Sequence, residues 1–243
     1  MSLNIRRVYL PQASEALGIV IVIDVIRAFT VAAYAFAGGA SRLWLVRTVE
    51  EAFALRKREP DALLAGEVGG YLIPGFDINN SPSRLQATDV QDKLIIQRTG
   101  AGTQGAAGAI NASHLLICSL VNAHATANYA RQLAQETGDP ITLLPTERPE
   151  PPYNWVGEDS VCADYLEALI QEQENATGQL NENLARLEAA GRFESFQQGD
   201  PDIPFKDIAL ITDIDRFRFV MSGKHKQWQN ITYVEVERIG AFL

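Results

Sequence analysis

Short apolar runs alternate with longer stretches of helical periodicity through the first 145 positions of the chain. The short runs are apolar on both faces, which is typical of strands covered on both sides in a parallel or mixed sheet. Alternation of such strands with helices predicts a layered α/β fold. We expect strands at residues 18–24, 42–46, 62–67, 93–97, 114–119 and 141–145.

Capping signals bound the expected helices. Thr48 is placed to cap a helix over "TVEEAFALRKR", Gly38 and Gly39 end the helix "FTVAAYAFAGGA", and Gly138 ends the helix that begins near Val121. Beyond residue 155 we expect a helix over "EDSVCADYLEALIQEQ", a more polar helix over "QLNENLARLEAAGRFESFQQG" and a closing, half-exposed strand "ITYVEVERI".

A proline-rich segment divides the chain. Residues 145–155, "PTERPEPPYNW", hold four of the eleven prolines, which predicts an extended surface connection. We expect it to join an N-terminal α/β lobe, residues 1–144, which carries most of the site, to a C-terminal α/β lobe, residues 145–243. The two lobes count as one domain if they share a core.

Composition and charge narrow the class of protein. A formal net charge of −9 argues against a general nucleic-acid or anionic-membrane binder, and we interpret the basic stretch "RFRFVMSGKHKQW" as a solvated face. The two cysteines form no CxxC pair, no signal peptide precedes the first strand, and no apolar run is long enough to span a bilayer. We therefore expect a soluble cytoplasmic protein.

In such folds, ligand-binding and catalytic residues lie beyond the carboxyl ends of the strands. The first expected strand ends at Asp24, with Arg27 and Thr30 just after it, and the third ends at Glu67. Acidic, small polar and glycine residues follow the other strands and the proline segment. They are Asp77, Asn80 and Ser81 in "FDINNSPS", Arg98, Gly100, Gly102 and Thr103 in "RTGAGT", Ser119 and Asn122 in "SLVN", and Glu158 and Asp159 in "GEDS".

Each of these residues also has a purely structural interpretation. Asp24 could cap the following helix, and Glu158 and Asp159 suit the first turn of one. "RTGAGT" is not a Walker motif, yet its small residues could expose backbone N–H groups to an anion. The histidine spacing argues against zinc, and the absence of GxSxG argues against an α/β-hydrolase. A magnesium site needs only one to three carboxylates with water, which this sequence can supply.

Five segments occur in the order and spacing of a known family. They are "VIDVIRAFTVAAYAFAGGA", "AGEVGGYLIPGFDINNSPS", "RTGAGTQGAAGA", "CSLVNAHATA" and "GEDSVCADYLEALI", and the chain resembles the 2-phosphosulfolactate phosphatase (ComB) family over residues 18–170. The resemblance implies a three-layer α/β/α fold with a mixed, largely parallel sheet. It also implies a magnesium-dependent acid phosphatase that converts 2-phosphosulfolactate to sulfolactate and phosphate, a step towards coenzyme M.

The resemblance also implies roles for the residues at the strand ends. Arg27, the backbone of loop 99–103 and the helix after Ser119 would hold the anionic groups of a small substrate. Asp24 either attacks phosphorus directly or only holds the metal while a metal-bound water attacks; we favour direct attack. The metal ligands would come from Asp24, Glu67, Asp77, Glu158 and Asp159, and the substrate ligands from Arg27, Thr30, Asn80, Ser81, Arg98, Gly100, Gly102, Thr103, Ser119 and Asn122.

Two departures from the family pattern bear on specificity. Val68 stands where the family commonly has arginine, and Ala101 stands where it has asparagine. Two alternatives therefore stay open: a phosphatase for another small phosphorylated carboxylate, and a non-catalytic anion-binding protein. The sequence leaves the oligomeric state open as well, because the apolar "VAAYAFAGGA" is either core, which we expect, or the interface of a homo-oligomer.

Overall fold

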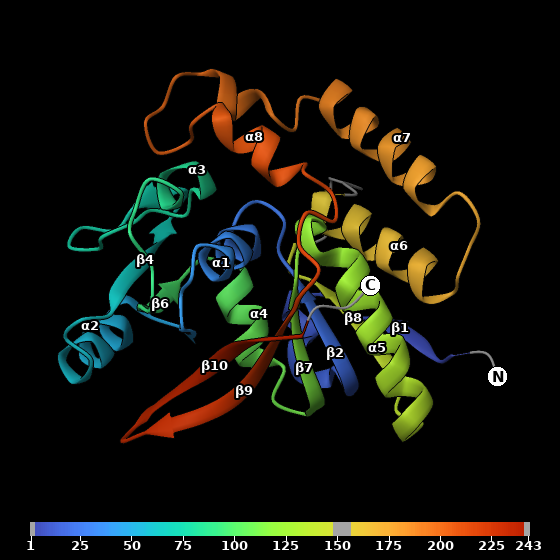
Figure 1. Ribbon diagram of the computed structural model, residues 1–243, viewed down its shortest axis with the longest axis horizontal. Helices are drawn as coiled ribbons and strands as arrows, with labels where there is room; N and C mark the ends of the chain where they lie inside the picture. Colours follow the sequence, from blue (N-terminus) through green and yellow to red (C-terminus); the bar gives the residue numbers. More distant parts are fainter. Residues whose placement is uncertain (1–2, 148–156, 241–243) are drawn as a thin grey trace.

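The computed structural model describes residues 3–147 and 157–240, and the strands within this part of the chain form one ten-stranded sheet (Figure 1). Its strand order is β1-β8-β2-β7-β9-β10-β3-β6-β4-β5. The strands are β1 (Ile5–Arg7), β2 (Gly18–Ile23), β3 (Arg42–Val46), β4 (Leu63–Val68), β5 (Tyr71–Leu72), β6 (Leu94–Arg98), β7 (Ala112–Cys118), β8 (Ile141–Pro145), β9 (Val220–Trp228) and β10 (Ile231–Ile239).

Helices connect most of these strands. The α-helices are α1 (Ala28–Ala37), α2 (Val49–Arg58), α3 (Pro82–Leu85), α4 (Gly102–Gly108), α5 (Ala123–Thr137), α6 (Glu158–Ile170), α7 (Ala176–Ala189) and α8 (Lys206–Ile211). Short 3₁₀ helices are η1 (Leu10–Glu15), η2 (Leu120–Asn122) and η3 (Glu194–Gln197).

The sheet is mixed, and it consists of two parallel groups joined by a hairpin. Strands β1, β8, β2 and β7 run parallel to one another, and so do β3, β6 and β4. The antiparallel hairpin β9–β10 lies between the two groups and pairs with β7 on one side and β3 on the other. Two elements from the end of the chain therefore complete a sheet that is otherwise built before residue 146.

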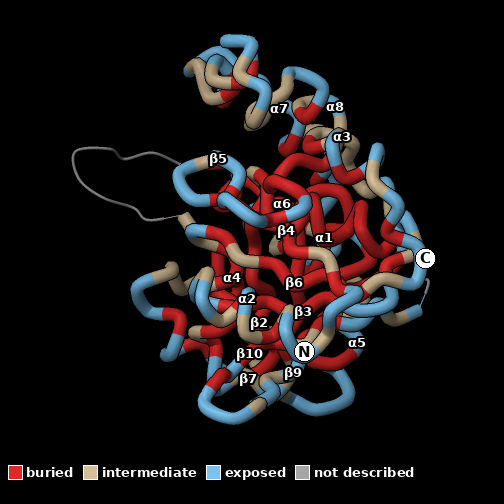
Figure 2. Tube along the Cα trace, turned by 90° about the vertical axis from the view of Figure 1, so that its left-hand side faces the viewer, coloured by how far each residue is buried: buried red, intermediate tan, exposed pale blue. Residues whose placement is uncertain are grey.

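The two groups of parallel strands pack against the same pair of helices. Residues of α1 and α4 belong to one hydrophobic cluster with residues of β2 and β7 and with residues of β3 and β6. Helices α5, α6 and α7 cover the other face of the β2 group, and α2 covers the other face of the β3 group. The result is the expected three-layer α/β/α arrangement, with the strands in its buried interior (Figure 2).

The expected elements are confirmed closely in the first 145 residues. All six residues of β2 are buried, as an apolar run in a covered strand requires. The side chain of Thr48 accepts a hydrogen bond from the Glu51 amide in a capping box at the start of α2. Gly138 ends α5 in the left-handed conformation, with φ of +76°.

Other features differ from expectation. Strands β1 and β5 were not expected, and the stretch interpreted as a solvated basic face contains β9, in which Val220 and Met221 are fully buried. That interpretation was wrong for these two positions because β9 lies inside the sheet, where Met221 packs in the hydrophobic cluster on one face and Val220 in the cluster on the other. The proline-rich connection lies largely outside the described residues, so the division into two lobes stays a prediction. Within the described ranges, no helix is both long and apolar enough to cross a membrane.

Candidate active site

Asp24 directly follows β2 and precedes α1. Its amide donates to the carbonyl of Cys118 on β7, and its Oδ1 accepts from the amide of Ala28 at 3.0 Å. A third backbone group, the amide of Gly102, also bonds the carboxylate. The side chain therefore bonds the first amide of α1, although the N-cap residue of that helix is Arg27, and it is almost completely buried, with 5% exposure.

Burial dominates the acid chemistry of Asp24. Removal of the carboxylate from water raises its pKa to about 7, although the amides of Ala28 and Gly102 lower it. The negative charges of Glu158 and Glu67 also contribute to this raised value. Asp24 is thus a carboxyl group that changes charge near neutral pH and has other acids close by.

Glu67, near the end of β4, is held by two backbone amides. Its Oε1 accepts from Gly100 at 2.6 Å and its Oε2 from Gly70 at 2.8 Å. The guanidinium of Arg98 donates to the main-chain carbonyl of Glu67 at 2.7 Å, and its buried Nε has no partner among the described residues. The carboxylate of Glu67 is therefore fixed from its own hairpin and from the loop after β6.

The loop "TGAGT" lies between Asp24 and Glu67. A Cβ at Gly102 would come within 2.6 Å of Oδ2 of Asp24, and a Cβ at Gly100 within 3.3 Å of Oε1 of Glu67. Thr99 and Thr103 close the loop by exchanging hydrogen bonds between their amides and hydroxyls. The loop was expected to hold a substrate anion, but its amides in this structure hold carboxylates of the protein.

Asp159 approaches from the first turn of α6. Its Oδ1 accepts from the amide of Val25 at 2.8 Å, and its Oδ2 accepts from the hydroxyl of Thr146 at 3.0 Å. Burial raises its pKa well above the usual value, and the charges of Asp24 and Glu158 add to the effect. Because Asp159 bonds the residue next to Asp24, the two carboxyl groups sit side by side behind the β2 strand end.

Glu158, beside Asp159, is paired with a cation. Arg192 donates from Nε and Nη2 to the two oxygens of Glu158 at 2.5 and 2.6 Å. Glu147 lies in the same cluster and bonds the hydroxyl of Ser160; burial raises its pKa, and the charge of Glu158 raises it further. Glu158 is thus near the other acids but has both oxygens occupied.

Arg27, expected to meet substrate anions, is engaged within the protein. Its Nη1 donates to the carboxylate of Asp207 at 2.9 Å and to the carbonyl of Asp202 at 2.8 Å, and its Nη2 donates to the carbonyl of Gly70 at 3.2 Å. The ring of Phe196 lies 5.8 Å from its guanidinium carbon. These contacts fasten segment 202–207 to the loop that follows Asp24.

Asp77 is the one expected metal ligand that the structure places elsewhere. Its Oδ2 accepts from the amide of Leu64 and from Arg56 at the end of α2. Leu64 lies at the start of β4, whereas Glu67 lies near its end, so the length of the strand separates the two acids. The contacts of Asp77 hold the loop before Ile78 against β4.

The remaining expected substrate ligands that lie outside the loop 99–103 are buried side chains that form hydrogen bonds within the protein. Ser81 caps α3 and donates to Asp207, and Asn80 accepts a long bond from Gln97. Thr30 donates to Ser119, whose amide donates to the side chain of Asn122. These hydrogen bonds fix the side chains within the protein, and contact between any of them and a substrate stays a prediction.

The carboxylates of the site suit a magnesium ion that takes only part of its ligands from the protein. Within the described residues, no three His, Cys, Asp or Glu side chains converge well enough to hold a metal by themselves. Magnesium commonly takes only one or two carboxylates and fills its shell with water and substrate phosphate. Asp24, Glu67 and Asp159 supply such carboxylates, because none of them forms an ion pair within the described ranges. The charge of Glu67 adds to the burial that raises the pKa of Asp24, and the charge of Asp24 adds to the burial that raises the pKa of Asp159.

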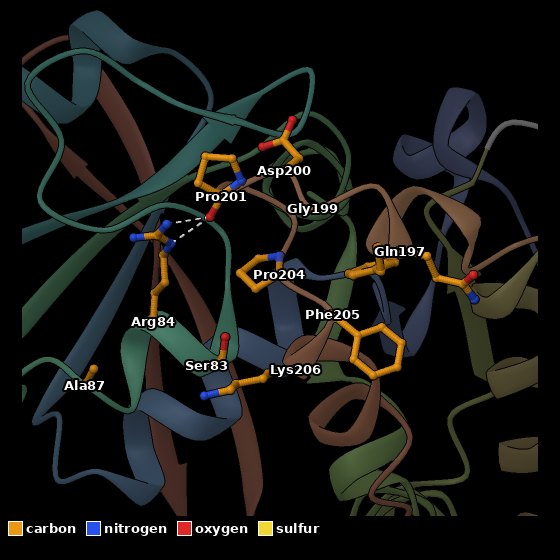
Figure 3. A pocket seen from close by; sticks show the side chains of 11 residues that line it. Ser83, Arg84, Ala87, Gln197, Gly199, Asp200, Pro201, Pro204, Phe205 and Lys206 are labelled. Carbon is orange, nitrogen blue, oxygen red and sulfur yellow. Dashed lines mark hydrogen bonds between the residues drawn. The ribbon is translucent and has the colours of Figure 1, made fainter.

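A separate cavity lies beside this site. It has a volume of about 690 Å³ and lies between α3 and segment 199–206, where Arg84 donates twice to the carbonyl of Pro201 (Figure 3). None of the carboxylates described above lines it.

Sequence reasoning did not find three residues of the site. Arg192, Asp207 and Glu147 all make buried or partly buried contacts there. Arg192 and Asp207 do not follow a strand of the expected sheet, and Glu147 follows the strand expected at 141–145 but lies in the proline-rich segment that was interpreted as a surface connection. Arg192 had one local signal, since it follows Gly191, a helix-ending residue with φ of +82°. No local pattern indicates that Asp207 meets Arg27, because 180 positions separate them.

Comparison with known proteins identifies relatives over most of the chain. A family model described as 2-phosphosulpholactate phosphatase matches residues 7–224. A protein of Bacillus subtilis named probable 2-phosphosulfolactate phosphatase is 40% identical over 205 residues, which cover 84% of this chain and 86% of the relative. Proteins with the same name from Deinococcus radiodurans and Thermus thermophilus are 44% and 43% identical over 119 residues, about half of each chain.

Proposed function

The chain belongs to the 2-phosphosulpholactate phosphatase family, and from this membership we propose that it hydrolyses 2-phosphosulfolactate to sulfolactate and inorganic phosphate with the help of Mg²⁺. The family makes the protein a phosphoric monoester hydrolase, the enzyme class that the resemblance implied. The substrate, the metal and the roles of individual residues are the parts we propose.

One observation carries the proposal. Asp24, Glu67 and Asp159 come from three different parts of the chain, are all buried, and are each held by backbone amides. No ion pair compensates them within the described ranges. Buried carboxylates without a counter-charge are costly unless a cation or proton joins them, and this arrangement is suited to phosphoryl transfer.

One or two of these three carboxylates would hold the metal, with water and phosphate oxygens as its other ligands. Bound there, Mg²⁺ supplies positive charge to the phosphoryl oxygens in the transition state. We leave Glu158 out of the set because both of its oxygens accept from Arg192.

We assign the attack on phosphorus to Asp24. One carboxylate oxygen of Asp24 bonds to phosphorus while the bond from phosphorus to the ester oxygen of sulfolactate breaks, and that oxygen takes up a proton from water. Water then hydrolyses the aspartyl phosphate and releases phosphate. The amides of Ala28 and Gly102 orient the carboxylate throughout. The alternative, attack by water with Asp24 only as a ligand, uses the same residues.

The proposal is tested by measuring phosphate release from 2-phosphosulfolactate, phospholactate, phosphoglycolate and p-nitrophenyl phosphate, with MgCl₂ and with EDTA. We expect MgCl₂-dependent release that prefers 2-phosphosulfolactate and is lost in Asp24→Asn. Release from the other substrates alone would reject the substrate, and Val68, 54% exposed at the end of β4, would then be the first position to examine. Acid quenching with ³²P-labelled substrate separates the two mechanisms, because only direct attack labels the protein.

A further inference from the structure

Arg192 is fixed in position by the end of α7. The amide of Gly191 donates to the carbonyl of Glu188, and the amide of Arg192 donates to the carbonyl of Leu187. This pair of bonds is a Schellman motif, with Gly191 in the left-handed conformation that it requires. Phe193, which follows, is buried in the cluster that covers the β2 group. Arg192 thus starts from a backbone fixed by this motif, and its side chain reaches Glu158 in the first turn of α6.

Its side chain is only partly used by the protein. Two of the five N–H donors of the guanidinium bond Glu158. No other described residue accepts a hydrogen bond from Arg192, and 30% of its side chain is exposed, against 8% for Glu158. A guanidinium bound along one edge keeps donors on its other edge, in a fork that matches two oxygens of a phosphate group.

The charges around Arg192 are strongly negative. Burial lowers the pKa of Arg192, but the hydrogen bonds and charge of Glu158, with the charges of Asp159 and Glu147, raise it more. Glu158 in turn repels the carboxylate of Asp24. Within the described ranges, no other Arg or Lys side chain forms an ion pair with these four acids. A substrate carrying phosphate, carboxylate and sulfonate cannot approach such a cluster without cationic help.

We propose that Arg192 binds the phosphoryl group of the substrate, with Glu158 as the positioning residue that orients its guanidinium. This inference rests on the proposed phosphatase function and adds the residue that delivers the phosphate to Asp24. Arg27 is less available for this role because three of its donors bond Asp202, Asp207 and Gly70 and its side chain is only 5% exposed. Arg192 also comes from the part of the chain beyond residue 170, so it is a determinant that the motifs near the strand ends do not contain.

The test is binding of inorganic phosphate in MgCl₂, measured by isothermal titration calorimetry, alongside KM for 2-phosphosulfolactate. We expect Arg192→Gln to weaken phosphate binding and to raise KM by about tenfold or more, which corresponds to about 1.4 kcal/mol. Arg186→Gln is the matched control, since Arg186 lies on α7 and its side chain makes only exposed contacts, with Glu182 and Asn183. It should change neither quantity.

Several outcomes would overturn the inference. If Arg192→Gln keeps its phosphate affinity within twofold and only lowers the melting temperature, Arg192 merely stabilises Glu158. If the glutamine variant does not fold, Arg192→Lys tests whether the two-donor fork of the guanidinium is needed. Unchanged phosphate affinity in a folded lysine variant would reject binding of phosphate by that fork. Wild-type protein that binds no phosphate would reject it too. If phosphate binding depends on Arg192 but 2-phosphosulfolactate is not hydrolysed, the substrate proposal fails and this inference stands.

Discussion

Gly102 lies directly against the carboxylate of Asp24, so that a Cβ at position 102 would come within 2.6 Å of Oδ2 and within 2.9 Å of the Cβ of Ala28. Both neighbours are buried, and neither is the free end of a flexible side chain. A methyl group at Gly102 must therefore displace Asp24, and a displacement of about 1 Å at a reacting group can cost about a hundredfold in rate.

We expect Gly102→Ala to lower kcat/KM by that order while the protein stays folded. Gly100→Ala is the graded comparison, because its Cβ would meet Glu67 at 3.3 Å, a distance that a small shift relieves. Steady-state kinetics with circular dichroism would check both variants. Equal activity of the two alanine variants would mean that contact with Asp24 is not what makes glycine necessary.

The raised pKa of Asp24 predicts how metal-free stability depends on pH. Its pKa is 3.8 as a free group and about 7 in the fold, so the folded state binds the proton more tightly. The stabilisation is present below pH 3.8 and is lost as the pH rises towards 7. Asp24→Asn keeps a neutral side chain throughout, so above pH 7 we expect it to be more stable than wild type by a few kcal/mol. Urea denaturation in EDTA at several pH values would measure this, and parallel pH curves for the two proteins would contradict it.

Metal affinity should follow the same titration. Magnesium competes with the proton on Asp24, so its affinity should rise with pH up to about 7 and then level off. Titration calorimetry with MgCl₂ below and above this pH would show the change. Asp24→Asn should bind more weakly and with a flatter pH dependence. A wild-type affinity that does not vary with pH would remove Asp24 from the metal site.

The sequence was sufficient for most of the fold because the buried strands are short, apolar and separated by well-capped helices. Thr48 and Gly138 are examples in which one local interaction fixes a helix end. The sequence was also sufficient to predict Asp24 and Glu67 as site residues, since both lie where apolar runs end. It could not supply Arg192 or Asp207, because their partners are more than 30 residues away and no periodicity reports such contacts.

Asp77 shows the opposite case, a residue that the sequence predicts as a metal ligand although its contacts in the structure only stabilise the fold. Its carboxylate joins Arg56 and the amide of Leu64, and its side chain is 34% exposed. We expect Asp77→Asn to keep kcat/KM within twofold and to lower the free energy of unfolding by about 1 kcal/mol. Kinetics and urea denaturation would measure the two effects. A large loss of activity without loss of stability would return Asp77 to the metal site.

Arg27 and Asp207 form an ion pair in which the side chains are 5% and 0% exposed. Removing one partner leaves a buried charge, so we expect Arg27→Gln to cost about 3–5 kcal/mol of stability. The double variant Arg27→Gln with Asp207→Asn removes both charges and leaves an amide oxygen that can still accept from Ser81 and from the amide of Ser83. It should therefore recover much of that stability.

The same pair of variants separates structure from substrate binding. If Arg27 only fastens segment 202–207 to the loop after Asp24, KM should recover in the double variant together with stability. If Arg27 also contacts substrate anions, as the sequence suggested, stability should recover while KM stays high. Denaturation and steady-state kinetics on the two variants distinguish these cases, because a buried pair can be replaced by a neutral one but a substrate anion still needs its cation.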